Sequence, residues 1–146
     1  MTLHELSQCY WLDKEVEVIK EQIRRLEASI SGVQSPIISD MPRGPRKAVS
    51  RTEQSALQLV DLRERLSEAV AEYTSERVRL EEYIANIPDS LTRLIFRKRF
   101  IEGLTWRGVA DAVGGNNTED GVRKTCRRYL ARSEEADQGT ECTKRG

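Results

Sequence analysis

The sequence predicts an all-α protein, in which a long antiparallel helical hairpin or coiled coil is followed by a C-terminal helix-turn-helix. Two patterns carry this prediction: apolar residues recur every three or four positions along two long stretches, and three shorter helical patterns separated by glycines follow them. The composition agrees, because 33% of the residues are charged and only 5% are aromatic. Such a chain favours helices that bury narrow stripes over a large globular core.

The first long helix is expected to begin at Thr2 and Glu5, whose capping-box spacing can satisfy free N–H groups of the first turn. Ser31 and Gly32 are expected to end it. Between them the apolar positions alternate in steps of three and four, as in a heptad seam. They are Cys9, Leu12, Val16, Ile19, Ile23, Leu26 and Ile30.

Residues 32–50 are expected to form a flexible loop, because they hold three of the four prolines and two glycines. Ser50 and Glu53 repeat the capping-box spacing and predict the start of a second, longer helix. Its seam again follows steps of three and four, apart from Glu76. The seam residues are Leu59, Leu62, Leu66, Ala69, Tyr73, Leu80, Tyr83 and Ile87.

Folding one seam onto the other gives an antiparallel hairpin over residues 1–87. Packing within one chain and an intermolecular coiled coil are both compatible with these stripes. A two-helix hairpin has little area to bury, so a homo-oligomer formed through the hairpin is expected.

Residues 88–133 predict a second domain of three shorter helices. Pro88, Asp89 and Ser90 end the long helix and cap the next one, which is expected to stop at Gly103. Thr105 is expected to cap the middle helix, and residues 114–117, GGNN, to break it. Thr118 then caps the last helix of this domain, predicted over residues 119–132.

The last of these helices has one apolar face and one basic face. Val122, Cys126, Tyr129 and Leu130 share the apolar side, and the other side holds Arg123, Lys124, Arg127 and Arg128. The whole chain has no net charge, but residues 88–133 carry ten Lys and Arg against five Asp and Glu, a net +5. A basic helix after a glycine-containing turn is typical of a recognition helix that enters the major groove of double-stranded DNA.

The stretch RKRFIEGLTWRGVADAVGGNNTEDGVRKTCRRYL resembles region 4 of bacterial sigma-70-type factors. In layout the chain is similar to small phage and prophage proteins that are grouped with late-operon transcription activators. The resemblance implies a sequence-specific DNA-binding transcription regulator, and RNA polymerase is a further candidate partner.

Carried over by position, the resemblance places Val109, Ala110, Val113 and Val122 in the core and Gly114 in the turn. The residues that it implies for DNA contact are Thr118, Arg123, Lys124, Arg127 and Arg128. The sequence departs from the family pattern between Gly114 and Val122, where the turn is longer and a second glycine replaces an apolar residue.

Other functions are less well supported. No catalytic motif, metal-ligand cluster or cofactor signature is present, so an enzyme is not expected, and Cys126 on the apolar face is interpreted as a small buried hydrophobe. A helical protein-interaction module and a small terminase-like DNA-packaging subunit remain alternatives. No aromatic-rich promoter-melting segment is visible, which favours an accessory regulator over a self-sufficient sigma factor.

The ends of the chain give two further expectations. The start has no signal-peptide pattern, and no apolar run is long enough to span a membrane, so a cytoplasmic location is expected. Residues 134–146 are polar and without an apolar stripe, which predicts a disordered tail.

Overall fold

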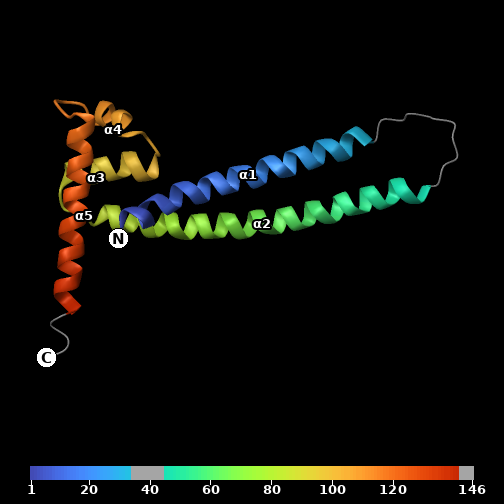
Figure 1. Ribbon diagram of the computed structural model, residues 1–146, viewed down its shortest axis with the longest axis horizontal. Helices are drawn as coiled ribbons and strands as arrows, with labels where there is room; N and C mark the ends of the chain where they lie inside the picture. Colours follow the sequence, from blue (N-terminus) through green and yellow to red (C-terminus); the bar gives the residue numbers. More distant parts are fainter. Residues whose placement is uncertain (34–44, 142–146) are drawn as a thin grey trace. The chain divides into compact units, whose positions relative to one another are not determined.

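The computed structural model describes residues 1–33 and 45–141, and within those ranges the regular structure is entirely helical (Figure 1). This confirms the all-α fold class. In chain order the elements are α1 (Leu3–Val33), α2 (Pro45–Ala85), α3 (Ser90–Phe96), the π-helical turn η1 (Arg97–Ile101), α4 (Trp106–Val113) and α5 (Glu119–Glu141).

Helix α1 begins with the predicted capping box. The Thr2 N–H donates to Glu5 Oε2 at 2.7 Å, and the Glu5 N–H donates to Thr2 Oγ1 at 3.3 Å. These bonds satisfy two N–H groups that have no partner inside the helix, and the bond from the Thr2 N–H to the carboxylate is the largest cause that lowers the pKa of Glu5. The helix ends at Val33, just beyond the predicted stop at Ser31 and Gly32.

Helix α2 begins earlier than the sequence suggested. It starts at Pro45, so Ser50 lies inside the helix and is not its N-cap, and residues 45–50 do not belong to a loop. The reason is that proline is well tolerated at the first helical position, where its missing N–H would have no partner in any case. The rest of the expected loop, residues 34–44, lies outside the described residues.

The chain divides into two compact units that do not follow the predicted domain boundary at residue 87. One unit is Asp13–Glu72, and the other joins Met1–Leu12 to Tyr73–Gly146. The physical reason is the core of the second unit, where Leu6, Leu80 and Ile84 are buried in one cluster with residues of the three C-terminal helices. The ends of the two long helices therefore belong to the C-terminal core.

Within the unit Asp13–Glu72, parts of α1 and α2 run side by side in opposite directions (Figure 1). Arg63 Nη2 donates to Glu27 Oε1 at 3.2 Å and links the two helices. Val16 and Ile23 of the first seam are buried, whereas Leu59, Leu62 and Leu66 of the second seam are only half-buried. The seams were predicted correctly here, but they leave much apolar surface accessible.

The other unit has a continuous core built around Phe96. The Phe96 ring centroid lies 5.4 Å from that of Phe100 and 5.5 Å from that of Tyr129, both in the tilted or edge-on geometry that aromatic rings prefer. The buried members of this core are Leu6, Cys9, Leu80, Ile84, Ile87, Ile95, Phe96, Phe100, Val109, Ala110, Val122, Cys126 and Leu130.

Helix α5 continues to Glu141, so residues 134–141 are not part of a disordered tail. No proline interrupts this stretch, and adding a residue to an existing helix gains a backbone hydrogen bond without a new nucleation cost. An apolar stripe is therefore not required for the extension. Residues 142–146 of the predicted tail lie outside the described residues.

Candidate nucleic-acid interface

Helix α3 starts at an aspartate cap, as the sequence predicted. The Asp89 carboxylate accepts hydrogen bonds from the Thr92 N–H at 2.9 Å and from Thr92 Oγ1 at 2.6 Å. These bonds favour the charged carboxylate and lower the pKa of Asp89. Thr92 is buried, and the bond from its Oγ1 to the exposed Asp89 carboxylate gives the hydroxyl a hydrogen-bond partner.

A π-helical turn, which the sequence did not predict, follows α3. The Glu102 N–H donates to the Arg97 carbonyl at 3.1 Å, and the backbone leaves the turn through Gly103, whose φ is 71°. Arg99 donates to the Leu104 carbonyl at 2.7 Å, and its guanidinium lies 4.8 Å from the centroid of the Trp106 ring. These contacts fix the connection into α4.

Helix α4 and the turn after it match the predicted pattern. Thr105 Oγ1 accepts from the Gly108 N–H at 3.1 Å and caps the helix, and Val109 and Ala110 are buried. The helix ends at Gly114, whose φ of 70° and ψ of −161° are essentially restricted to glycine. Gly115 also has a positive φ, of 65°. The two consecutive glycines therefore build the longer turn before α5.

Helix α5 is capped by Thr118 and held by its apolar face. Thr118 Oγ1 accepts from the Gly121 N–H at 3.1 Å, which confirms the predicted cap. Val122, Cys126 and Leu130 are buried on the side that contacts α3 and α4. The opposite side of the helix is therefore free to carry charged residues.

Burial raises the pKa of the Cys126 thiol to about 12, although Arg99 and Arg127 act in the opposite direction. The neutral thiol predominates in the folded protein at physiological pH, because desolvation penalises the thiolate. Cys126 is fully buried, as the interpretation of this residue as a small hydrophobe requires.

The predicted basic residues of α5 fall into two pairs with different surroundings. Arg123 forms an ion pair with Glu119 at 3.1 Å, and Lys124 forms one with Asp120 at 2.6 Å, both with an acid one turn earlier on the same helix. The Lys124 contact also lowers the pKa of Asp120. The first pair of cations is therefore partly neutralised within α5.

The second pair, Arg127 and Arg128, is exposed and forms no ion pair with any described residue. Positions three and four apart are neighbours on a helix surface, so Lys124 lies next to both arginines. We call these three residues, Lys124, Arg127 and Arg128, the basic face of α5. Arg123 lies at the edge of this face, and only 37% of its side chain is exposed.

Arg132, one turn after Arg128, extends this surface but was not among the predicted contact residues. Both arginines line a groove between α5 and the start of α3, together with the hydroxyl-bearing Thr125 and Ser133 and with Asp89, which forms no ion pair with either arginine. The spacing of four from Arg128 was the available sequence signal. Beyond Arg132 the exposed residues of α5 become acidic at Glu134 and Glu135.

Two features are absent from the described parts of the chain. No group of three or more His, Cys, Asp or Glu side chains is placed to hold a metal ion there. In residues 1–33 and 45–141, none of the helices combines the length and apolar character needed to cross a bilayer. Comparisons with protein-family models, with curated proteins and with solved structures found no match.

Proposed function

We propose that this chain is a sequence-specific, double-stranded-DNA-binding transcription regulator of phage or prophage origin. In this proposal α4, the glycine turn and α5 act as a helix-turn-helix similar to sigma-70 region 4, which a long helical hairpin carries. Helix α5 enters the major groove, and Thr118, Arg123, Lys124, Arg127 and Arg128 contact the DNA.

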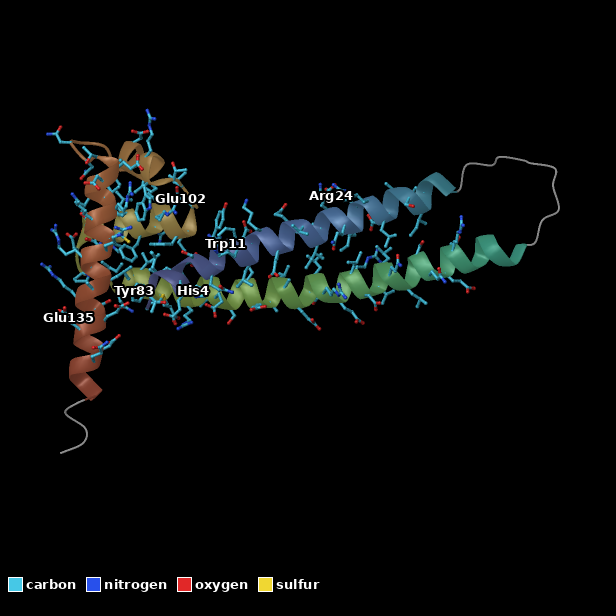
Figure 2. All side chains as sticks on the ribbon, in the orientation of Figure 1. His4, Trp11, Arg24, Tyr83, Glu102 and Glu135 are labelled. Carbon is cyan, nitrogen blue, oxygen red and sulfur yellow. The ribbon has the colours of Figure 1, made fainter. Side chains whose placement is uncertain are left out.

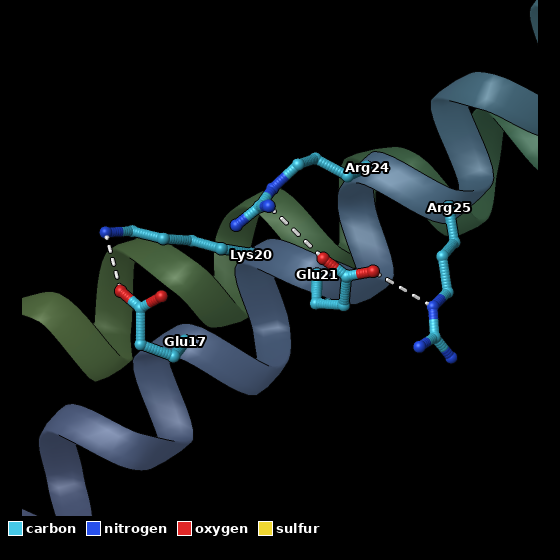
Figure 3. A network of polar contacts seen from close by, with 5 residues as sticks. All are labelled: Glu17, Lys20, Glu21, Arg24 and Arg25. Atoms are coloured by element: carbon cyan, nitrogen blue, oxygen red, sulfur yellow. Dashed lines mark hydrogen bonds and ion pairs between the residues drawn. The ribbon is translucent and has the colours of Figure 1, made fainter.

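The observation that carries the proposal is a difference in ion pairing: the arginines of α1 pair with an acid, whereas Arg127 and Arg128 do not. On α1, Arg24 and Arg25 both pair with Glu21, at 3.2 Å and 3.1 Å, in a network typical of a solvated helix face (Figure 3). Arg127 and Arg128 have no such acid among the described residues. Adjacent cations without a counter-charge favour a polyanion, because phosphates can neutralise both at once.

The ion pairs of Arg123 and Lys124 are compatible with DNA binding. Exposed pairs of this kind contribute about 0–1 kcal/mol each. A DNA phosphate can therefore replace Glu119 or Asp120 at little cost. We expect Arg127 and Arg128 to contribute more than Arg123 and Lys124, whose charges are already partly neutralised.

A second candidate function rests on the same two ion pairs. If Glu119 and Asp120 remain paired with Arg123 and Lys124, fewer cations of α5 are available to DNA. The chain would then act as a helical protein-interaction module. The salt dependence of binding separates the two functions, because each phosphate contact releases counterions and a protein partner with few charge contacts does not.

The test is the affinity of the full chain for fluorescently labelled duplex DNA, measured by anisotropy between about 50 and 200 mM salt. If each of the three residues of the basic face contacts one phosphate, the slope of log affinity against log salt should be about −2.7, from about −0.9 per contact. Competition with unlabelled duplexes of differing sequence then separates specific from non-specific binding. A chain that fails to bind any duplex at about 50 mM salt contradicts the proposal, since non-specific binding is strongest at low salt.

A further inference from the structure

A small cavity of about 270 Å³ lies where the first turns of α1 pass the π-helical turn. Its lining belongs to a single compact unit, since that unit joins Met1–Leu12 to Tyr73–Gly146. Trp11, Tyr10 and Ser7 contribute from α1, and Arg99, Phe100 and Thr105 contribute from the other side. None of these residues belongs to the basic face of α5.

The α1 side of the cavity is aromatic and exposed. Trp11, which Figure 2 labels on α1, is 61% exposed, and Tyr10 is 40% exposed. Their ring centroids lie 5.1 Å apart in an edge-to-face arrangement. The Tyr10 ring also lies beside Gly103, where an added Cβ would be 3.5 Å from it, an ordinary van der Waals distance. Aromatic walls of this kind favour a planar ring, which stacks on them and covers their exposed surface.

The opposite side of the cavity presents a cation. Arg99 is half-buried and forms no ion pair with any described residue; it donates to the Leu104 carbonyl, and its guanidinium lies 4.8 Å from the centroid of the Trp106 ring. A guanidinium has five N–H donors, so Arg99 has capacity for a second acceptor. A carboxylate fits best, because it pairs with guanidinium through charge-assisted hydrogen bonds.

The two hydroxyl groups at the rim differ in what they can still offer a ligand. Ser7 Oγ donates to the Leu3 carbonyl at 2.9 Å, whereas Thr105 Oγ1 accepts from the Gly108 N–H and keeps its own O–H as a donor. The choice of ligand therefore rests on the aromatic walls, on Arg99 and on this one hydroxyl donor, which also suits a carboxylate. The volume is below the roughly 300–1,000 Å³ of pockets that take drug-sized ligands, so the ligand is limited to one ring or one fused ring system.

We propose that this cavity binds a small planar aromatic carboxylate, with the ring against Trp11 and Tyr10 and the carboxylate on Arg99. The proposal does not depend on DNA binding by α5. Its test uses no DNA, so its failure would leave the proposed regulator function unaffected.

The first experiment compares two probes, indole-3-acetate and indole-3-acetamide, by calorimetry and ligand-observed NMR with the full chain. The two molecules share a ring and a size but differ in charge. The acid should bind about ten- to a hundredfold more tightly, as the loss of a charge-assisted hydrogen bond predicts. Equal binding of the two probes, or no binding of the acid at millimolar concentration, would overturn the proposal.

The second experiment locates the site with variants of exposed residues. Trp11→Ala should weaken indole-3-acetate binding by about two- to tenfold, the usual loss for one aromatic contact. Leu57→Ala is the matched control, because Leu57 is 67% exposed on α2 in the other compact unit, and it should bind as the wild type does. Circular dichroism checks that both variants remain folded.

Ser7→Phe provides an independent check, since the larger side chain would fill part of the cavity and should abolish binding. Unchanged affinity in both Trp11→Ala and Ser7→Phe would place the ligand elsewhere and contradict the assignment. If the chain does not bind indole-3-acetate but binds an acidic peptide with one tryptophan, the proposal would also be overturned, in favour of a macromolecular occupant.

Discussion

Ala110 lies on the side of α4 that is buried in the C-terminal core. It is 6% exposed and belongs to the same buried cluster as Val109 and Val122, which are fully buried. Helices α4 and α5 contact each other extensively. The resemblance to sigma region 4 implies that a small side chain at this position lets the two helices approach.

Ala110→Leu should therefore lower the free energy of unfolding by about 1–3 kcal/mol, because extra methylenes in a packed core force neighbours to move. Ala112→Leu is the matched control, since Ala112 is exposed on the same helix and its substitution should change stability little. Urea titrations followed by circular dichroism measure both. Equal stability of Ala110→Leu and wild type would show that the helix register at α4 is wrong.

Single residues were predicted well where the signal is local. The caps at Thr2, Thr105 and Thr118 follow from a hydroxyl placed just before a helical pattern, and each accepts the expected N–H. The sequence analysis did not predict the pairing of Arg123 with Glu119 and of Lys124 with Asp120. A spacing of four allows such pairs, but whether they form depends on the rotamers and competing partners around each side chain.

At the scale of the elements, the turn between α4 and α5 depends on glycine. Gly114 adopts a φ of 70° and a ψ of −161°, and a Cβ at this position would meet nothing within 4 Å. The need for glycine is therefore one of backbone conformation and not of space. Gly139 lies in α5 with no atom within 4 Å of an added Cβ and no positive φ.

The same substitution at the two glycines should have opposite effects. Gly114→Ala should destabilise the protein by about 1–3 kcal/mol, because it forces a side chain into a strained conformation. Gly139→Ala should raise the stability of α5 by up to about 1 kcal/mol, because alanine has the higher helix propensity. Thermal unfolding of both variants tests this pair, and a Gly114→Ala variant as stable as Gly139→Ala would contradict the turn geometry.

The boundaries of α2 and α5 show what a propensity argument leaves out. Proline at residue 45 was interpreted as a breaker, but at the first position of α2 it is compatible with a helix. The polar residues 134–141 were interpreted as a tail, but they extend a helix that Val122, Cys126 and Leu130 already anchor. In both cases the boundary of the helix depends on the neighbouring helical residues more than on the single residue type.

At the scale of the whole molecule, the partition into units could not be predicted from chain order. Leu6 and Cys9 of α1 join a core made mostly of residues after Leu80, because long-range packing brings them together. A periodic stripe identifies which side of a helix is buried but not which partner buries it. The apolar seams were therefore predicted in part, since the buried Leu6 and Ile84 were not among their residues, and the membership of each core was not predicted.

The unit Asp13–Glu72 leads to a prediction about assembly. Leu59, Leu62 and Leu66 remain half-buried in one chain, and Leu57 and Val60 are 67% and 52% exposed. Association of two or more chains would cover this apolar surface. We expect light scattering after size exclusion to give at least twice the 16.7 kDa chain mass at micromolar concentration. A mass of 16.7 kDa throughout a concentration series would contradict the homo-oligomer.

We propose that the basic face of α5 binds DNA, and the salt dependence of binding by Arg127→Ala/Arg128→Ala tests this most directly. If both arginines contact phosphates, the variant should flatten the slope of log affinity against log salt by about 1.8. Arg24→Ala/Arg25→Ala is the control, because it removes two exposed arginines from α1 and should keep the wild-type slope. A folded Arg127→Ala/Arg128→Ala variant with wild-type affinity and slope would contradict the account.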